Sequence, residues 1–295
     1  MTVSDILEPT AERRRQPVET ARVDSRGRLF NWICAIVLIL FALIWLVPVL
    51  WALDTALKPN EETTKTTWLI ENPTFDAFGR VLRDTDILRW FGSSVVIACI
   101  TTIGVVLTGS LAAYALSRMR FRYRNLVFWG ILAGIMIPGQ VLIVPQFREM
   151  DTFGLLNTFW AVSLVQMPTA VAVFIFKQFF DGLPRELEEV ARMDGAGFFR
   201  TYRQIVMPLT RPVVSAVAIF TFVTSWNDLL WPLLVLSNPD IMTVPVGLST
   251  VQGSFGIRYA DTMASAILGA IPLVAVFLLF QRNIVEGIAG SGLKG

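Results

Sequence analysis

The chain has 295 residues, of which 54% are hydrophobic and 16% are charged, with a formal net charge of +2 and a mean hydropathy of +0.59. Soluble domains carry roughly a quarter charged residues, so this balance indicates a protein embedded in lipid. The sequence contains no histidine, which removes the commonest metal ligand and general base. We therefore expect no metal site and no cofactor bound by this chain.

Six apolar stretches are long enough to cross a bilayer, whose core requires about 20 apolar residues in a helix. They cover residues 30–53, 90–117, 125–147, 156–180, 212–236 and 263–281. The pattern predicts an all-α integral membrane protein with six transmembrane helices in a domain over residues 30–285. Residues 1–29, which are rich in Arg, would be a disordered cytoplasmic tail, and residues 286–295 a cytoplasmic C-terminal tail.

The first of these stretches has an alternative interpretation as a cleaved signal peptide. It is longer than the apolar region of a signal peptide, and no small-residue cleavage site follows it, since the chain continues Trp51-Ala52-Leu53-Asp54. We expect a retained membrane anchor.

The positive charges that flank the stretches predict the orientation of the chain. Of the 25 Lys and Arg residues, 18 fall on the side that holds both termini and 7 on the other. Because Lys and Arg accumulate in cytoplasmic loops, both termini are expected in the cytoplasm.

Helix-breaking residues interrupt two of the spans. Pro138, Gly139 and Pro145 lie in the third, and Pro168 lies near the centre of the fourth, beside Gln166. Backbone groups freed by proline in lipid must be satisfied by neighbouring helices or by a water-lined cavity. Two explanations follow, which are ordinary kinked packing or a translocation pathway that Gln166 faces.

A charged island between Leu183 and Leu209 interrupts the apolar pattern. Its stretch from Arg185 to Arg203 contains eight charged residues. Pro184 suits a first helical position, and apolar residues then recur at helical spacing, with Glu188 four residues before Arg192. The recurring residues are Leu187, Val190 and Ala191. We expect a short amphipathic helix whose apolar face needs a partner.

The rest of the island predicts a second short helix. Gly195 and Gly197 would end the first helix, and an amphipathic turn would run from Phe198 to Val206 until Pro208 stops it.

Sequence motifs for nucleotide binding and for catalysis are absent. The chain has no phosphate-binding loop, no Cys-x-x-Cys and no Gly-x-Ser-x-Gly motif. Among charged residues only Asp228, in the outer part of the fifth span, comes close to the membrane interior, whereas an ion-coupled carrier would be expected to have several such groups. Energy for uphill transport would have to come from a partner.

The island resembles the signature cytoplasmic loop of the permeases of bacterial ABC importers. That signature reads Glu-Ala-Ala, three residues, Gly, nine residues, Ile, one residue, Leu-Pro. This chain keeps every spacing and departs only at Val190 for Ala and Met207 for Leu. Both replacements are apolar.

Four further stretches resemble the carbohydrate, or maltose-type, branch of these permeases. The C-terminal one is similar to the second permease of the pair. The stretches are Ala56–Pro59; Ile137–Gln140 with Gly154–Thr158; Ser225–Asp228 with Trp231-Pro232 and Thr243–Leu248; and Gly290–Gly295.

In this family the helix of the loop docks in a cleft of the ATPase subunit. The resemblance implies that Glu189 pairs with a basic residue of the ATPase and that Ala191 and Gly195 permit close approach. It also implies that Asp194 helps to cap the second helix, where a carboxylate is favoured.

The resemblance assigns two further roles near the ATPase. Ile205 and Pro208 would anchor the loop to the bundle. The tail that contains Gly290, Lys294 and Gly295 would reach between the ATPase subunits, although a Gly-rich tail is by itself only flexible.

Substrate contacts are expected at Trp226, Asn227 and Asp228, together with Gln166. A sugar offers hydroxyls to amide and carboxylate groups and its C–H faces to an aromatic ring. The alternative is that the first three only cap or break the outer end of the fifth helix.

Together these features predict the permease subunit of an ATP-driven, binding-protein-dependent sugar importer of the bacterial plasma membrane, working by alternating access. Its partners would be a second homologous permease, two copies of an ATPase that carries ATP and Mg, an extracytoplasmic binding protein and the bilayer, with no nucleic acid. Alternatives are an importer of glycerol 3-phosphate or glycerophosphodiesters, an integral-membrane enzyme, and a self-sufficient channel or carrier.

Overall fold

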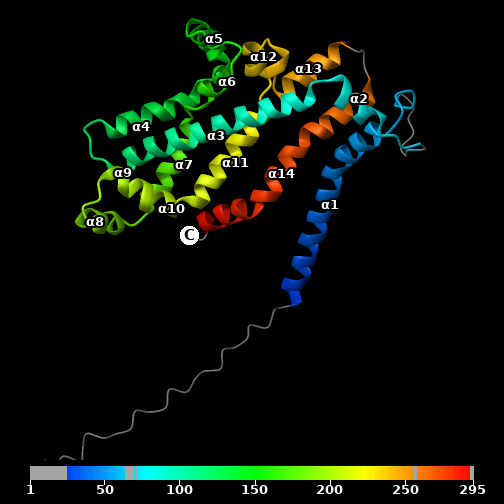
Figure 1. Cartoon of the computed structure of the whole chain (residues 1–295). Helices are drawn as coiled ribbons and strands as arrows, with labels where there is room; N and C mark the ends of the chain where they lie inside the picture. The colour runs from blue at the N-terminus through cyan, green and yellow to red at the C-terminus, as the bar shows by residue number, and fades with distance from the viewer. Residues whose placement is uncertain (1–24, 64–69, 71, 255–257, 293–295) are drawn as a thin grey trace, which may run out of the picture. The chain divides into compact units, whose positions relative to one another are not determined.

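The computed structural model describes residues 25–63, 70, 72–254 and 258–292. Throughout these ranges the regular secondary structure is helical and no strand is found, which confirms the all-α prediction. The chain divides into two compact units, Met1–Leu50 and Trp51–Gly295. The helical elements, in chain order (Figure 1), are α1 (Ser25–Ala56), α2 (Asp76–Asp84), α3 (Ile87–Arg118), α4 (Arg124–Ala133), η2 (Gly134–Met136), η3 (Gly139–Leu142), α5 (Ile143–Thr152), α6 (Phe159–Gln166), α7 (Ala170–Asp181), α8 (Glu186–Met193), α9 (Phe198–Thr201), η4 (Tyr202–Val206), α10 (Met207–Leu209), α11 (Arg211–Asn227), α12 (Leu230–Val235), η5 (Pro239–Ile241), α13 (Val244–Ser254) and α14 (Tyr259–Gly292).

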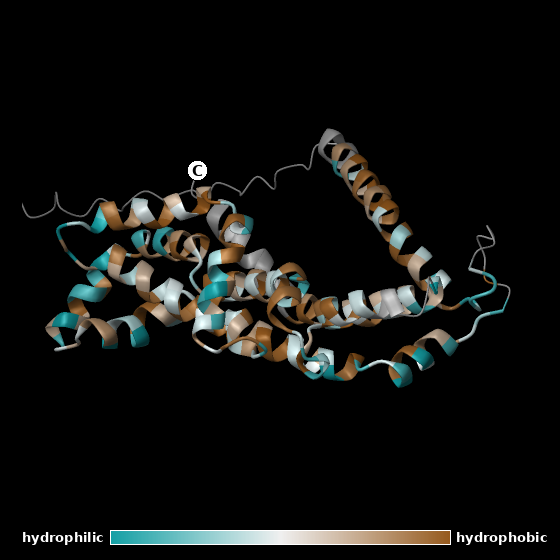
Figure 2. Cartoon of the chain, turned by 90° about the horizontal axis from the view of Figure 1, so that it is seen from above, coloured by the Kyte–Doolittle hydropathy of each residue, from teal (hydrophilic) through white to brown (hydrophobic). Residues whose placement is uncertain are grey.

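Three helices are uninterrupted and apolar enough to cross a membrane. In the described residues these are Phe30–Ala56 in α1, Ile87–Arg118 in α3 and Tyr259–Leu279 in α14. No charged residue lies between Phe30 and Leu53. Figure 2 shows hydrophobic residues along the helices and hydrophilic ones gathered at helix ends and in loops. The predicted first, second and sixth spans therefore correspond to continuous helices.

The other three candidate spans are bent helix pairs. Arg124–Met136 and Gly139–Thr152 meet at 94°, Phe159–Gln166 and Ala170–Asp181 at 49°, and Phe198–Leu209 and Arg211–Asn227 at 80°. Six spans result if each pair counts as one. The first two breaks fall at Pro138 and Pro168, as the positions of the prolines predict.

The fifth predicted span has a different course from the expected 212–236. Helix α11 ends at Asn227, Asp228 is extended, and the short helix α12 begins at Leu230. Pro232 accounts for the break, because it lacks the N–H that would bond to the carbonyl of Asp228 in a continuous helix and its ring would clash with that carbonyl. Pro232 is instead accommodated in the first turn of α12.

Within the Trp51–Gly295 unit, α3 is the central helix. It packs against α6, α7 and α11, and α11 packs in turn against α14 (Figure 1). A Cβ added at Gly109 of α3 would lie 3.1 Å from the Cβ of Ala172 in α7, so glycine permits this close approach. One apolar core surrounds the Arg118 end of α3, and a second, which includes Trp90 and Trp226, surrounds the Ile87 end.

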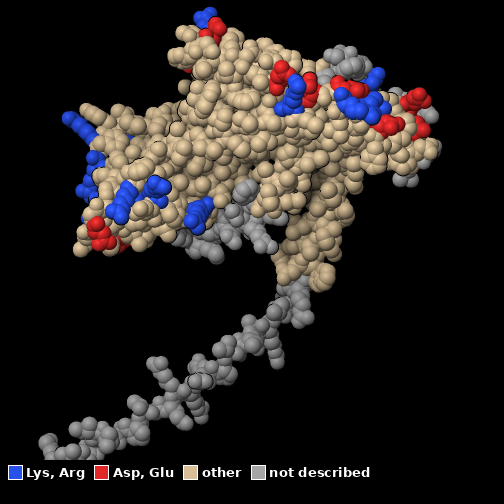
Figure 3. All heavy atoms as spheres, viewed as in Figure 1, with Lys and Arg blue, Asp and Glu red and all other residues tan. Residues whose placement is uncertain are grey.

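Charged residues of this unit gather at its two ends. In Figure 3 a group dominated by Lys and Arg lies over the end that carries α8, and groups of mixed sign lie over α5 and near α2. Between them the face in view is uncharged. This distribution matches an apolar band that lipid covers.

Gly247 offers a test of the packing at the Ile87 end. A Cβ at Gly247 in α13 would lie 2.2 Å from the ring of Trp90, whose indole N–H donates to the carbonyl of Pro239 at 3.1 Å. We expect Gly247→Ala to destabilise the purified chain in detergent by about 1–3 kcal/mol through overpacking. Thermal unfolding followed by loss of monodispersity measures the effect.

The control is Gly130→Ala in α4, where no atom lies within 4 Å of the new Cβ. Alanine is a better helix former than glycine, so this variant should be neutral or slightly stabilised. Equal stability of the two variants would contradict the packing around Trp90.

Candidate functional site

The charged island forms a short helix, α8, followed by a second helical segment, as the sequence predicts. Helix α8 begins at Glu186, so Pro184 lies two residues outside it rather than at its first position. Gly195 terminates α8 with a φ of +76°, a conformation that side chains other than glycine rarely adopt. Gly197 instead precedes α9 as its N-cap.

A buried ion pair fixes α8 to the transmembrane helices. Arg118 Nε, at the last residue of α3, lies 2.8 Å from Glu188 Oε1, and the two side chains are 4% and 7% exposed. Arg118 Nη2 donates to the carbonyls of Phe180 and Leu183. Phe180 lies in the last turn of α7, and Leu183 follows the end of that helix. One guanidinium thus joins the ends of α3 and α7 to α8. The two buried charges form an ion pair, although Arg118 Nε and Glu188 Oε1 do not have the geometry of a hydrogen bond.

The predicted pairing of Glu188 with Arg192 is wrong, because Glu188 turns toward Arg118. Arg192 lies over the ring of Phe198, with 4.8 Å between its Cζ and the ring centroid. This cation–π contact connects α8 to α9.

The second helical segment is held to the bundle by residues other than those expected. Tyr202 and Val206 are buried in the core around α3 and α7, and the hydroxyl of Tyr202 lies 2.7 Å from that of Ser110. Ile205 is only partly buried and Pro208 is exposed. Pro208 does not stop the segment, which continues to Leu209, while η4 immediately before α10 is a π-helical turn.

The apolar residues of α8 separate into two faces. Ala191 is buried, so its small side chain faces the rest of the chain and not the exposed side of α8. Val190 is 59% exposed, Met193 is 86% exposed, and Leu187 is also exposed. Glu189 projects from the exposed side and, within the described residues, forms no ion pair. An exposed apolar face next to an acidic residue remains available to a partner.

The expected capping role of Asp194 is wrong. Asp194 is the C-cap of α8, and α9 has Gly197 at its N-cap with no side-chain hydrogen bond. The two residues between them, Gly195 and Ala196, place the carboxylate too early in the chain for a local cap on α9.

The structure describes the predicted C-terminal tail as far as Gly292, and α14 continues through it to that residue. Gly290 is in the last turns of α14, which extends to Gly292, whereas Lys294 and Gly295 fall outside the description.

Away from α8, a side-chain hydrogen bond joins the break after α6 to the break after α11. Gln166 ends α6 and Asp228 follows α11, and the side-chain amide of Gln166 donates to Asp228 Oδ2 at 2.7 Å. Asn227 is exposed and donates to the carbonyl of Val223. Trp226 differs from its neighbours, because it is buried between Phe91 and Phe222 and donates to the carbonyl of Gly269. In this structure Trp226 is a packing residue.

Sequence reasoning missed Arg118 and Tyr202. Arg118 was counted only as one positive charge at a membrane boundary, and nothing in its local sequence identifies a partner 70 residues away. One signal was available for a buried basic partner. Helix α8 has three glutamates in eight residues, so a glutamate on the side that faces the bundle needs a positive charge there. No group of three or more Cys, Asp or Glu residues in the described ranges could hold a metal ion.

These features define a class of protein: a helical membrane protein with broken spans and a short helix, exposed on one apolar face, that a buried ion pair fixes to them. The chain belongs to the family described as the inner membrane component of binding-protein-dependent transport systems, whose pattern matches residues 105–288. It is a transport subunit and not an enzyme, as the sequence predicts.

Curated relatives match between 68% and 90% of the chain. It is 34% identical over 272 residues to the arabinooligosaccharides transport system permease protein AraQ of Halalkalibacterium halodurans, covering 90% of this chain and 98% of that protein. It is 32% identical over 270 residues to the diacetylchitobiose uptake system permease protein NgcG of Streptomyces coelicolor, covering 90% and 89%. It is 39% identical over 201 residues to the sn-glycerol-3-phosphate transport system permease protein UgpE of Yersinia enterocolitica, covering 68% and 72%.

Solved structures share the fold. A chain of a bacterial ABC transporter involved in the import of the acidic polysaccharide alginate superimposes with a TM-score of 0.79 at 20% identity, covering 94% of this chain and 100% of that one.

The buried ion pair yields a stability prediction. Arg118→Met leaves Glu188 buried without its partner and frees two carbonyls, so we expect a loss of about 3–5 kcal/mol. Glu188→Gln should cost less, because Arg118 keeps its carbonyl acceptors. Thermal unfolding and limited proteolysis at α8 measure both effects.

The control is Arg200→Gln, an exposed arginine on α9 whose partner is Gln204. Its effect should stay within about 0.5 kcal/mol. If Arg118→Met were as stable as this control, Arg118 would not hold α8 in place.

Proposed function

We propose that the chain is one permease of an ATP-driven importer for a neutral di- or oligosaccharide, working by alternating access. The observation that carries the proposal is the exposed apolar face of α8 on an element fixed to the bundle. The family supports import with a binding protein, and the substrates named for the relatives from Halalkalibacterium and Streptomyces support a saccharide.

The coupling step follows from the contacts of α8. Leu187, Val190 and Met193 would enter a cleft of the ATPase, with Glu189 paired to a basic residue beside it. Closure of the ATPase dimer would then push α8. Because Arg118 joins α8 to the ends of α3 and α7, the displacement reaches both helices together.

Assembly requires a second permease, two ATPase copies that bind ATP and Mg, and an extracytoplasmic binding protein. The excess of Lys and Arg on the side of α8 supports a cytoplasmic location for both termini and for α8, in a bacterial plasma membrane. The last residues, with Gly290, Lys294 and Gly295, would approach the ATPase from the same side.

The solute pathway is proposed at the joined helix breaks. Gln166 and Asp228 bond to each other, and the Asp228 carboxylate also accepts from the backbone N–H groups of Leu230 and Trp231. Sugar hydroxyls would therefore meet mainly the amide of Gln166 and the exposed Asn227 beside it. Trp226 would contact solute only after repacking, since its indole is enclosed by aromatic neighbours. A change in the angle between α6 and α7 would move Gln166 away from Asp228.

Glycerol 3-phosphate is the second candidate substrate, favoured by the similarity to the Yersinia permease. The charges near the proposed pathway argue for a neutral solute. The ionisable group of the proposed pathway is Asp228, whose negative charge would repel a phosphate. In the candidate spans the nearest Lys and Arg residues lie toward helix ends.

Gly195 provides a test of the coupling role. Gly195→Ala forces an L-residue into a positive φ and should displace the end of α8, at a cost of about 1–2 kcal/mol. Gly195→Glu adds bulk and charge at the docking site, so we expect sugar uptake and solute-stimulated ATPase activity to collapse while the complex still inserts in the membrane.

The matched control is Gly197→Ala, which also has open space around its Cβ but an ordinary φ of −73°. It should retain near-normal uptake. Unchanged uptake in Gly195→Glu would sink the coupling assignment.

The substrate class is tested through the binding protein encoded alongside this chain. We expect neutral oligosaccharides to raise its melting temperature, because a ligand that binds the folded state stabilises it. Thermal shift measured against a panel of saccharides and glycerol 3-phosphate decides between the two candidates, and stabilisation by glycerol 3-phosphate alone would reverse the choice.

A further inference from the structure

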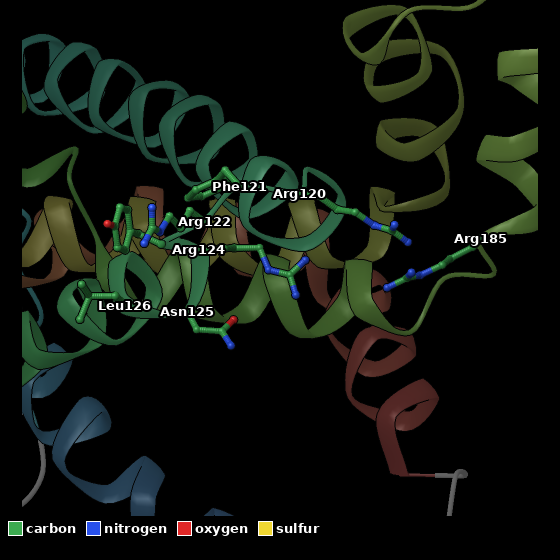
Figure 4. A pocket seen from close by; sticks show the side chains of 8 residues that line it. Arg120, Phe121, Arg122, Arg124, Asn125, Leu126 and Arg185 are labelled. Atoms are coloured by element: carbon green, nitrogen blue, oxygen red, sulfur yellow. The ribbon is translucent and has the colours of Figure 1, made fainter.

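A second feature of the α8 end is a basic hollow that the coupling step does not use. It has a volume of about 680 Å³ and lies between the α3–α4 connection and the residue that precedes α8. Figure 4 shows Arg120 and Arg124 on one side and Arg185 on the other, with their guanidinium groups directed toward the same space. The full lining is Arg120, Phe121, Arg122, Tyr123, Arg124, Asn125, Leu126 and Arg185.

The charged side chains that line this hollow are all positive. Its lining contains four arginines and no carboxylate. Within the described residues, none of the four forms an ion pair. Glu188 is engaged by Arg118. Arg120 and Arg185 also line a neighbouring hollow together with Glu189, which forms no ion pair within the described residues, so four arginines share one unpaired carboxylate nearby. Like charges that converge in this way repel one another unless an anion lies between them.

The start of α4 adds to the need for an anion. Arg124 is the first residue of this ten-residue helix, the N-cap Tyr123 supplies no side-chain hydrogen bond, and the first turn contains no acid. A positive side chain at a helix N-terminus opposes the helix dipole, whereas an anion there is favoured by the dipole and by the unpaired N–H groups.

The surroundings of the hollow indicate where the anion comes from. Helix α4 is the first half of a candidate span, so its N-terminus lies at a membrane boundary. Leu126, which lines the hollow, is 69% exposed, and Trp129 one turn further along α4 is 66% exposed. Apolar side chains and an interfacial Trp below a cluster of arginines match acyl chains below a phosphate.

We propose that this hollow binds the phosphate headgroup of an anionic phospholipid, with its acyl chains along Leu126 and Trp129. Because Arg185 immediately precedes α8, the bound lipid would bridge the α3–α4 connection and the start of the coupling segment. Only the choice of leaflet rests on the proposed orientation of the chain, which would place the site in the cytoplasmic leaflet.

The test is lipid binding to the purified full chain in detergent, counted by native mass spectrometry during titration with phosphatidylglycerol or phosphatidylcholine. The wild type should bind phosphatidylglycerol at least about tenfold more tightly than it binds phosphatidylcholine. Each arginine near a membrane surface contributes about fivefold in affinity, so the triple variant Arg120→Gln, Arg124→Gln, Arg185→Gln should lose about 100-fold.

The matched control removes the same number of charges elsewhere on that side, in Arg200→Gln, Arg203→Gln, Arg211→Gln, and should keep the preference. If the first triple variant fails to fold, Arg120→Gln alone should still lose about fivefold, since Arg120 forms no ion pair in the described structure. Equal binding of the two lipids by the wild type, or equal losses in both triple variants, would overturn the proposal.

Two further measurements distinguish a bound lipid from other anions in the hollow. Displacement of phosphatidylglycerol by millimolar inorganic phosphate would indicate a free-phosphate site instead. Release of the lipid on addition of the cognate ATPase would assign the hollow to acidic residues of that protein. Retention in both measurements supports the lipid. Because lipid binding is measured without transport, failure here leaves the importer assignment intact, and failure of the uptake tests leaves this site intact.

Discussion

The arrangement of the α8 end depends on one buried guanidinium. Arg118 lies at the last turn of the central helix, and its planar group reaches Glu188 and two backbone carbonyls at once. A lysine, which presents a single charged nitrogen, could not occupy the three acceptors with the same geometry. The burial of this pair means that α8 is rigidly attached although it lies outside the spans. A force applied to α8 therefore reaches α3 and α7 without being absorbed by a loose loop.

The sequence was sufficient for the helical class and for the positions of the continuous spans, because an apolar run of more than 20 residues is a property of the local chain. It was also sufficient for two breaks, since proline acts locally at 138 and 168. It failed at the fifth span, where composition extends the apolar run past Asn227 while Pro232 requires a new helix. Hydropathy averages over such a position and does not detect it.

The site was predicted in outline, and its internal contacts were not. The spacing around Gly195 located helix α8 and its turn, which depend on backbone conformation. Glu188 was assigned to Arg192 by helical spacing, yet the partner is Arg118, because the fold buries Glu188 against the end of α3 and a buried charge requires an opposite one beside it. The anchors were likewise misplaced by a few residues, since the π-helical turn before α10 changes which side chains face the bundle. Gln166 and Asp228 were suggested independently, and only the three-dimensional fold joins them.

The exposed face of α8 differs from the other apolar surfaces of the chain in what covers it. Lipid would cover the spans on insertion, whereas Val190 and Met193 are exposed and, in the proposed arrangement, stay in water until the ATPase binds. If α8 docks on an ATPase as proposed, a copy of the chain without that partner presents an apolar patch to the proteases and chaperones of that compartment. Surplus copies would be removed more quickly than assembled ones, so the docking helix would also balance the numbers of the subunits in the cell.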